Sequence, residues 1–272
     1  FPNKPTYLTS QLGIWLFTTV VLFLVCVFFG YSLFIIFRQK RLSEIQGDFI
    51  NNMTHEFNTP ISSILVMSQL LKKEEVSSSS TKVSEYSGLI TREATRIKDQ
   101  IDKILQIAIM DNHKAIYSFD AVDIQACLNE VFAITEHRIV EKGGTINKSI
   151  NTNQTLINGD SVHLTNVFFN LIDNSIKYNS NAPEISIVTY NAKKRIYIKI
   201  CDNGIGIDKK YQKMLFSKFF RIPTGNVHNV KGFGIGLYYA RKVILAHKGS
   251  IILKSNPMIG TEFTISLPLI KK

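Results

Sequence analysis

The chain is poor in cysteine, and its basic residues do not cluster. Cys26, Cys127 and Cys201 are the three cysteines in 272 residues, too few and too far apart for a disulfide framework or a zinc site. Lys and Arg number 32 against 21 Asp and Glu, a formal net charge of +11. They form no long basic run and no ladder of alternating basic and aromatic residues. We therefore exclude a disulfide-rich secreted protein and expect no nucleic-acid partner.

One long segment lacks charge altogether. The 26 residues from Leu12 to Phe37 contain no Asp, Glu, Lys, Arg or His. As a helix they would extend about 39 Å, against roughly 30 Å of bilayer hydrocarbon. The run is too long for a signal peptide, and no small-residue cleavage site follows it. The segment is therefore predicted to be a single transmembrane helix.

The flanking charges orient this helix. Arg38, Lys40 and Arg41 follow it directly, whereas only Lys4 precedes it. The positive-inside bias then places everything after residue 37 in the cytoplasm. We expect an inner (cytoplasmic) membrane protein in which residues 1–11 are the outer-side tail of a sensor region that this sequence does not include.

Residues 38–113 have the pattern of two helices. One is expected from Arg38 to about Leu71, and the other from about Thr81 to Met110, with a turn over Glu74 to Ser80. In the second, apolar residues recur in steps of three and four, with Val83, Ile90, Ile97 and Ile104 seven apart, which is typical of a coiled-coil seam. Two helices bury little surface alone, so we expect a homodimer with a four-helix bundle. A hairpin packed on its own chain's other domain is the alternative.

His55 lies on the first of these helices, opposite its apolar stripe, and is expected to face solvent. Glu56 follows it, and Pro60 removes a backbone hydrogen bond and frees the Glu56 carbonyl. A carboxylate that accepts from Nδ1–H would leave Nε2 as a nucleophile. The surroundings of His55 therefore favour a phosphoryl acceptor.

Residues 114–272 alternate between strand and helix patterns. Helices are expected over Asp123 to Val140, with Asp123 as cap, over Ser161 to Tyr178 and over Gly234 to His247. Mostly antiparallel strands with three helices on one face predict an α+β two-layer sandwich. The expected strands are Ile116–Phe119, Gly143–Ile150, Glu184–Asn191, Arg195–Cys201, Ser250–Ser255 and Thr261–Leu267.

Three motifs in this region point to a nucleotide. NLIDNSIKY puts Asn170, Asn174, Lys177 and Tyr178 on one side of a helix, where amide oxygens can hold Mg²⁺ and the lysine can meet phosphates. In CDNGIGID, Asp202 can accept from an exocyclic amine, and Gly204 and Gly206 allow a tight turn. KGFGIGL, with Gly232, Gly234 and Gly236, opens a helix and exposes backbone N–H groups to anions. Its GxGxG spacing is not that of a Rossmann fingerprint.

These motifs resemble those of sensor histidine kinases of two-component systems. FINNMTHEFNTPISSI, residues 49–64, is similar to their phospho-acceptor motif at His55, Glu56, Thr59 and Pro60, although Asn58 stands where a basic residue is common. NLIDNSIKY, CDNGIGID, MLFSKFFR, KGFGIGL and GTEFTISLP resemble, in this order, the gyrase-type ATP-binding domain of the family. The likeness extends over residues 38–268.

The resemblance implies roles for individual residues. His55 would be phosphorylated from ATP, Glu56 would assist proton removal, and Thr59 would help to dephosphorylate the partner, a response regulator receiver domain with an acceptor aspartate. Asn170 and Asn174 would hold Mg²⁺, and Thr261 would lie beside Asp202 near adenine. ATP contacts are also implied for Lys177, Tyr178, Gly204, Gly206, Arg221, Gly232, Gly234, Gly236 and Leu237, with residues 221–231 as a mobile lid.

Asn170 also separates this chain from hydrolytic relatives of the same fold. Those enzymes have a Glu on this helix as the base that activates water, and an amide cannot take that proton. The phosphoryl group must then pass to a nucleophile that is brought in, and His55 is the candidate. Two rival functions remain: a sensor that only dephosphorylates its partner through Thr59, and a receptor or scaffold with a vestigial ATP site.

Overall fold

The computed structural model describes residues 4–111, 117–179, 181–222 and 233–270. The chain divides into two compact units, residues 1–50 and 51–272. Helix α1 belongs to both.

α1 extends from Lys4 to Leu71, 68 residues, with Pro60 inside it. The predicted apolar segment therefore continues as one helix into the predicted phospho-acceptor region. Among the described residues this is the one helix long and apolar enough to cross a membrane, and none of its most apolar window is buried within the structure.

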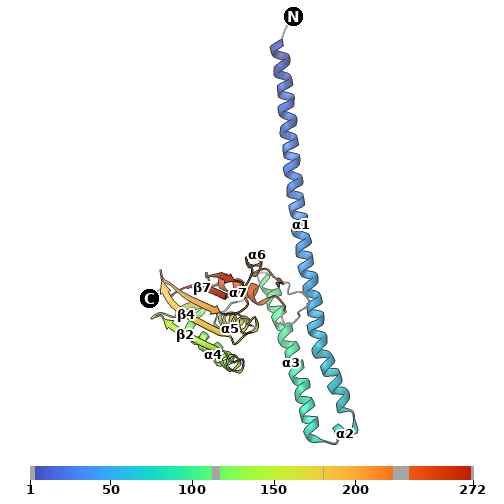
Figure 1. The fold of residues 1–272 in the computed structure, drawn as a ribbon, viewed down its shortest axis with the longest axis vertical. Coiled ribbons are helices and arrows are strands. Elements are labelled where there is room, and N and C mark those ends of the chain that lie inside the picture. The colour runs from blue at the N-terminus through green and yellow to red at the C-terminus, as the bar shows by residue number, and fades with distance from the viewer. Residues whose placement is uncertain (1–3, 112–116, 180, 223–232, 271–272) are drawn as a thin grey trace. The chain divides into compact units, whose positions relative to one another are not determined.

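α1 is followed by a tight reversal and a second long helix. The predicted turn contains one helical turn, α2 (Glu74–Ser77), which buries the side chain of Val76. α3 (Ser80–Asp111) then runs back in the opposite direction (Figure 1), within one residue of its predicted ends.

The C-terminal region is built on a five-stranded sheet with the order β2-β4-β5-β7-β6. β2 is parallel to β4, and the other neighbours are antiparallel. The strands are β2 (Thr145–Asn151), β4 (Glu184–Ala192), β5 (Arg195–Asp202), β6 (Ser250–Asn256) and β7 (Gly260–Pro268). A separate antiparallel pair joins β1 (Asp120–Asp123) to β3 (Leu156–Gly159).

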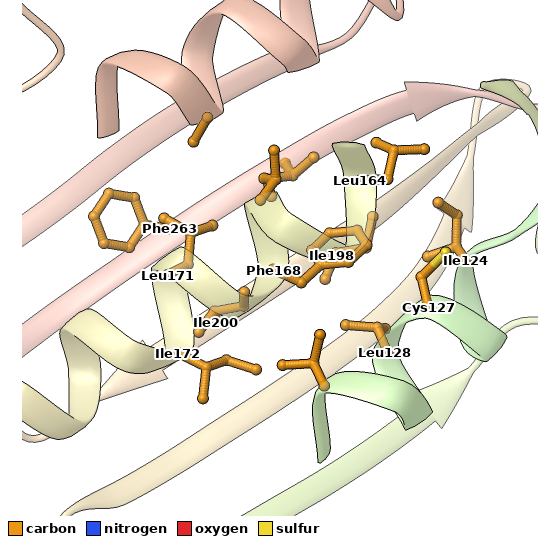
Figure 2. Close-up of a cluster of buried hydrophobic side chains, with 14 of the residues drawn as sticks. Ile124, Cys127, Leu128, Leu164, Phe168, Leu171, Ile172, Ile198, Ile200 and Phe263 are labelled. Atoms are coloured by element: carbon orange, nitrogen blue, oxygen red, sulfur yellow. The ribbon is translucent and has the colours of Figure 1, made fainter. Parts of the chain in front are cut away.

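Helices cover one face of this sheet. Alternate residues of β5, Ile196, Ile198 and Ile200, are fully buried in one cluster with side chains of α4, α5 and α7. Figure 2 shows Leu128 of α4, with Phe168 and Leu171 of α5, filling the space against β5 and β7. Each such burial contributes about 1.5–3 kcal/mol. The helices are α4 (Ile124–Glu141), α5 (Ser161–Lys177), α7 (Gly236–Ala246) and the short α6 (Lys209–Gln212).

The two long helices on this face begin at aspartate caps. Asp123 Oδ1 accepts a hydrogen bond from Gln125 N at 2.9 Å, as predicted for α4. Asp160 Oδ1 accepts from His163 N at 3.0 Å at the start of α5. Each carboxylate satisfies a backbone donor that the helix leaves unpaired. The sheet, with helices covering one of its faces, confirms the predicted α+β two-layer sandwich.

One predicted strand is wrong. Residues 117–119 are not in a strand, and β1 begins instead at Asp120; Ile116 lies outside the described residues. Ser118 N donates to the Asp160 carboxylate at 2.9 Å, so a side chain takes the place of a sheet partner here. Two elements were not predicted: β3, the strand that pairs with β1, and the helix α6. Each has only four residues.

Candidate functional site: a nucleotide cavity and an exposed histidine

The polar side of α5 faces a cavity. Leu164, Phe168 and Leu171 on the opposite side are fully buried in the core. Asn170, Asn174, Lys177 and Tyr178 all line one cavity, so the predicted common face exists. This follows from the helical period, which separates the apolar positions from the amides.

Lys177 is already paired in this structure. Its Nζ lies 2.5 Å from Asp173 Oδ2, and the other carboxylate oxygen, Oδ1, accepts from Arg138 at 2.9 Å. A phosphate contact by Lys177 would therefore require it to share or exchange this carboxylate. Asp173 was not among the predicted site residues, although its spacing of four from Lys177 is that of a helical ion pair.

Asp202 is held at the end of β5 by hydrogen bonds from three residues. Its Oδ1 accepts from Gly204 N at 2.9 Å and from Thr261 N at 3.2 Å. Its Oδ2 accepts from the hydroxyl of Ser175, on α5, at 2.9 Å. Asp202 and Thr261 are direct partners in the β5–β7 register, so the expected proximity is present. The roles of both residues toward adenine stay predictions.

Burial acts on the charge of Asp202. Removal from water raises the pKa of its carboxyl group, whereas the hydrogen bonds from Gly204, Ser175 and Thr261 lower it. Burial also raises the pKa of the Tyr178 phenol on the same cavity. A half-buried carboxylate with fixed donors is suited to recognise an amine.

Two glycines in this region are required by their backbone. Gly206 has φ +66°, and a Cβ there would lie 1.9 Å from the carbonyl oxygen of Asn256. Gly234 has φ +68°, and its Cβ would lie 2.8 Å from Phe220 O. Both combine a left-handed conformation with close backbone approach, which only glycine allows.

The predicted glycine-rich segment leads into α7. Gly234, Gly236 and Leu237 line the cavity, as does Arg221 before the segment. Gly232 and the predicted lid residues 223–231 lie outside the described residues. The first turn of α7 therefore brings its backbone to the cavity that the amides of α5 also line.

His55 lies in a different part of the second unit, on α1. It is exposed, as its position opposite the apolar stripe predicted, and Glu56 beside it is half-buried. Thr59 is exposed, and its hydroxyl donates to the His55 carbonyl at 3.1 Å. Glu56 also lines the cavity described above.

Two family models match the chain. One describes the histidine kinase A phospho-acceptor domain and matches residues 45–113. The other describes the ATPase domain shared by histidine kinases, DNA gyrase B and HSP90, and matches residues 159–271. The first contains His55, and the second contains every residue assigned above to the nucleotide cavity of the C-terminal region.

A relative from Bacteroides fragilis, the sensor protein RprX, is 38% identical over 273 residues. The match covers this whole chain but 53% of the relative, so the chain spans about half of that protein's length. Two solved histidine kinases share the fold at 22% identity. Full-length ShkA with AMPPNP has a TM-score of 0.62 over 81% of this chain and 45% of its own. ThkA in complex with the response regulator protein TrrA has a TM-score of 0.55 over 86% and 64%.

The phospho-acceptor match precedes the ATPase match along the chain, and each contains its expected motifs. The chain belongs to the two-component sensor histidine kinases.

Proposed function

We propose that this chain autophosphorylates His55 from MgATP and passes the phosphoryl group to an aspartate of a response regulator receiver domain. The observation that carries the proposal is that the chain has both an exposed histidine in a phospho-acceptor domain and a cavity lined by Asp202. The proposed boundaries are 12–37 for the membrane span, 38–113 for the dimerisation and phosphotransfer hairpin, and 114–272 for the ATP-binding domain.

In the proposed complex the adenine end of ATP lies at Asp202 and Thr261, because this carboxylate is fixed to accept an amine. The phosphates extend toward the first turn of α7, because Gly234 and Gly236 line the cavity there and the N–H groups of a helix N-terminus attract anions. Lys177 contributes a positive charge once it shares Asp173. The AMPPNP in the ShkA structure supports a nucleotide for this fold.

Mg²⁺ fits the residues present. The described residues hold no cluster of three His, Cys, Asp or Glu side chains for a metal, so an all-protein cage is not available there. Asn170 and Asn174 line the cavity, and Mg²⁺ takes amide oxygens as ligands together with several phosphate oxygens and waters. When bound, the ion would neutralise phosphate charge.

The transfer step uses the imidazole of His55. Its Nε2 lone pair forms the P–N bond to the γ-phosphorus while the bond from this phosphorus to the bridging oxygen breaks, and ADP leaves with that electron pair. The ring then loses its Nδ1 proton, for which the Glu56 carboxylate is the proposed acceptor. In the onward step a regulator aspartate attacks the phosphorus, and the P–N bond breaks.

Several further parts of the proposal concern the whole protein. The apolar part of α1 is assigned to the cytoplasmic membrane, with the catalytic part in the cytoplasm, and the hairpin is assigned to a homodimer. The regulator is the proposed partner because ThkA has been crystallised with one. Thr59 is assigned to hydrolysis of the regulator's phosphoaspartate.

The test is incubation of the full chain, in detergent micelles, with γ-labelled ATP and Mg²⁺. We expect an acid-labile, base-stable label that disappears in His55→Ala. His137→Ala is the matched control, because His137 is also an exposed helical histidine, 79% exposed at its side chain. Nucleotide binding without label would favour the phosphatase-only sensor, and the absence of both would favour a vestigial site.

A further inference from the structure

The two oxygens of the Asp202 carboxylate have different surroundings. Oδ1 accepts two backbone N–H groups, from Gly204 and Thr261, which is close to the capacity of one carboxylate oxygen. Oδ2 accepts from one partner, the Ser175 hydroxyl at 2.9 Å. Oδ2 is therefore the oxygen with capacity left for a ligand.

Ser175 has two acceptors and one proton. Its hydroxyl lies 3.2 Å from Leu171 O and 2.9 Å from Asp202 Oδ2. Serine in a helix commonly donates to the carbonyl four residues back, which would make this residue structurally ordinary. The shorter distance and the negative charge favour the carboxylate instead, since charge-assisted bonds are the stronger ones. Ser175 is 3% exposed, so water does not compete for this donor.

We propose that Ser175 is a positioning residue for base selection: its hydroxyl holds Asp202 ionised and directs Oδ2 toward the 6-amino group of adenine. The proposal rests on the nucleotide site proposed above. An ionised carboxylate can accept the adenine amine and repels the 6-oxo group of guanine. A protonated carboxyl group can donate to that 6-oxo group, so loss of the charge relaxes the choice of base.

The local groups make this effect specific to Ser175. Burial raises the pKa of Asp202, and the hydrogen bonds from Gly204, Ser175 and Thr261 oppose that rise. Two of these donors are backbone groups that a side-chain substitution leaves in place. The neighbouring titratable groups of the packed elements are Asp173 and Lys177 on α5, Cys201 on β5 and Glu262 on β7, and Asp202 raises the pKa of Cys201. Removal of the Ser175 hydroxyl therefore isolates one contribution to the carboxylate.

The experiment measures binding of ADP and of GDP to the full chain in detergent by calorimetry, from about pH 5 to about pH 8, because burial raises the carboxyl pKa of Asp202 above its ordinary value. The variants are Ser175→Ala, Ser175→Cys, whose thiol is a weak donor of similar size, and Thr189→Val. Thr189 is the matched control, because its hydroxyl is buried in β4 and has no hydrogen-bond partner.

We expect the pH at which ADP affinity is half lost to rise by about one unit in Ser175→Ala, and by less in Ser175→Cys. The preference for ADP over GDP should fall by about three- to tenfold in the same window. Thr189→Val should keep the wild-type dependence of affinity on pH. Titration of the nucleotide itself affects every variant alike, so the comparison with this control accounts for it. A general loss of packing would weaken both nucleotides equally at every pH.

Wild-type binding with unchanged pH profile and base preference in both Ser175 variants would overturn this inference and leave the proposed kinase function standing. A uniform loss of affinity without a shift would also overturn it. A wild-type chain that binds neither nucleotide and labels no histidine would instead overturn the proposed function, and this inference with it.

Discussion

At the scale of single residues, the nucleotide cavity depends on a close backbone contact that leaves no room for a side chain. Gly206 brings its Cα against the backbone of Asn256, and the N–H of Met258 donates to Ile205 O at 2.8 Å. The β6–β7 turn and the loop after Asp202 are thereby joined through their backbones. The two loops act as one support for the Asp202 carboxylate.

Substitution of Gly206 by Ala should therefore be severe. Its Cβ would lie 1.9 Å from Asn256 O, so the loops must separate, and we expect more than about 2 kcal/mol of lost stability together with lost ATP binding. Gly143→Ala is the control, because Gly143 has nearly the same φ, +71°, but nothing within 4 Å; it should cost only about 1 kcal/mol. Urea unfolding of both variants measures the difference, and equal costs would contradict the steric argument.

His247 is a second residue whose state is fixed by its neighbours. Its Nδ1 lies 2.8 Å from Val243 O, and its Nε2 accepts from the backbone N–H of Asp160 at 2.8 Å. The ring is 2% exposed, and burial lowers the pKa of the imidazole despite the Asp160 carboxylate nearby. A proton on Nε2 would oppose the Asp160 N–H directly.

The domain should therefore lose stability in mild acid. Because the folded-state pKa of His247 lies below its ordinary 6.5, this contribution is complete above that pH and falls as the pH drops toward the folded value. His247→Gln keeps an acceptor near Asp160 N but does not titrate. Thermal melts from pH 7.5 to about pH 5 should show a smaller acid loss in His247→Gln than in wild type, and equal slopes would assign the loss to other groups.

At the scale of elements, the sequence predicted the helices and strands that have a regular apolar period. It did not predict the short strands that depend on partners far along the chain. α3, α5 and the β4–β5 hairpin have long apolar repeats, so local pattern sufficed. β1 and β3 have four residues each and pair across long separations, from Asp123 with Leu156 to Asp120 with Gly159, which no local pattern reveals. For the same reason the cavity residues were identifiable by motif, but the Ser175–Asp202 bond, which joins a helix to a strand end, was not.

The residues of the β4–β5 turn are not the ones that its backbone conformation prefers. Its two loop residues, Lys193 and Lys194, have φ of 49° and 62°, the conformation of a type I′ turn, in which Asn-Gly is preferred. The double change Lys193→Asn and Lys194→Gly should raise stability by about 1 kcal/mol.

Thermal unfolding checks this change. Lys213→Gly is the control, because Lys213 has φ −67° and gains nothing from glycine there; it should lower the melting temperature. A double variant that melts no higher than wild type would mean that strain in the turn is already relieved elsewhere.

At the scale of the whole molecule, α1 is one continuous helix from Lys4 to Leu71. A continuous helix can transmit rotation, because insertion of two residues turns everything after it by about 200°, whereas seven residues restore the phase to within about 20°. Two residues inserted at Gly47 should therefore change His55 labelling in membranes several-fold, and seven should return it near the wild-type rate. Equal labelling in both would contradict a rigid connection.

The sheet order also has a consequence for biosynthesis. β7, the last strand along the chain, lies inside the sheet between β5 and β6, and Thr261 at its start completes the Asp202 cluster. A nascent chain still lacking β7 leaves β5 with an unpaired edge and the carboxylate without one of its donors. The ribosome must therefore release β7 before this sheet and the hydrogen bonds of the Asp202 carboxylate can be complete.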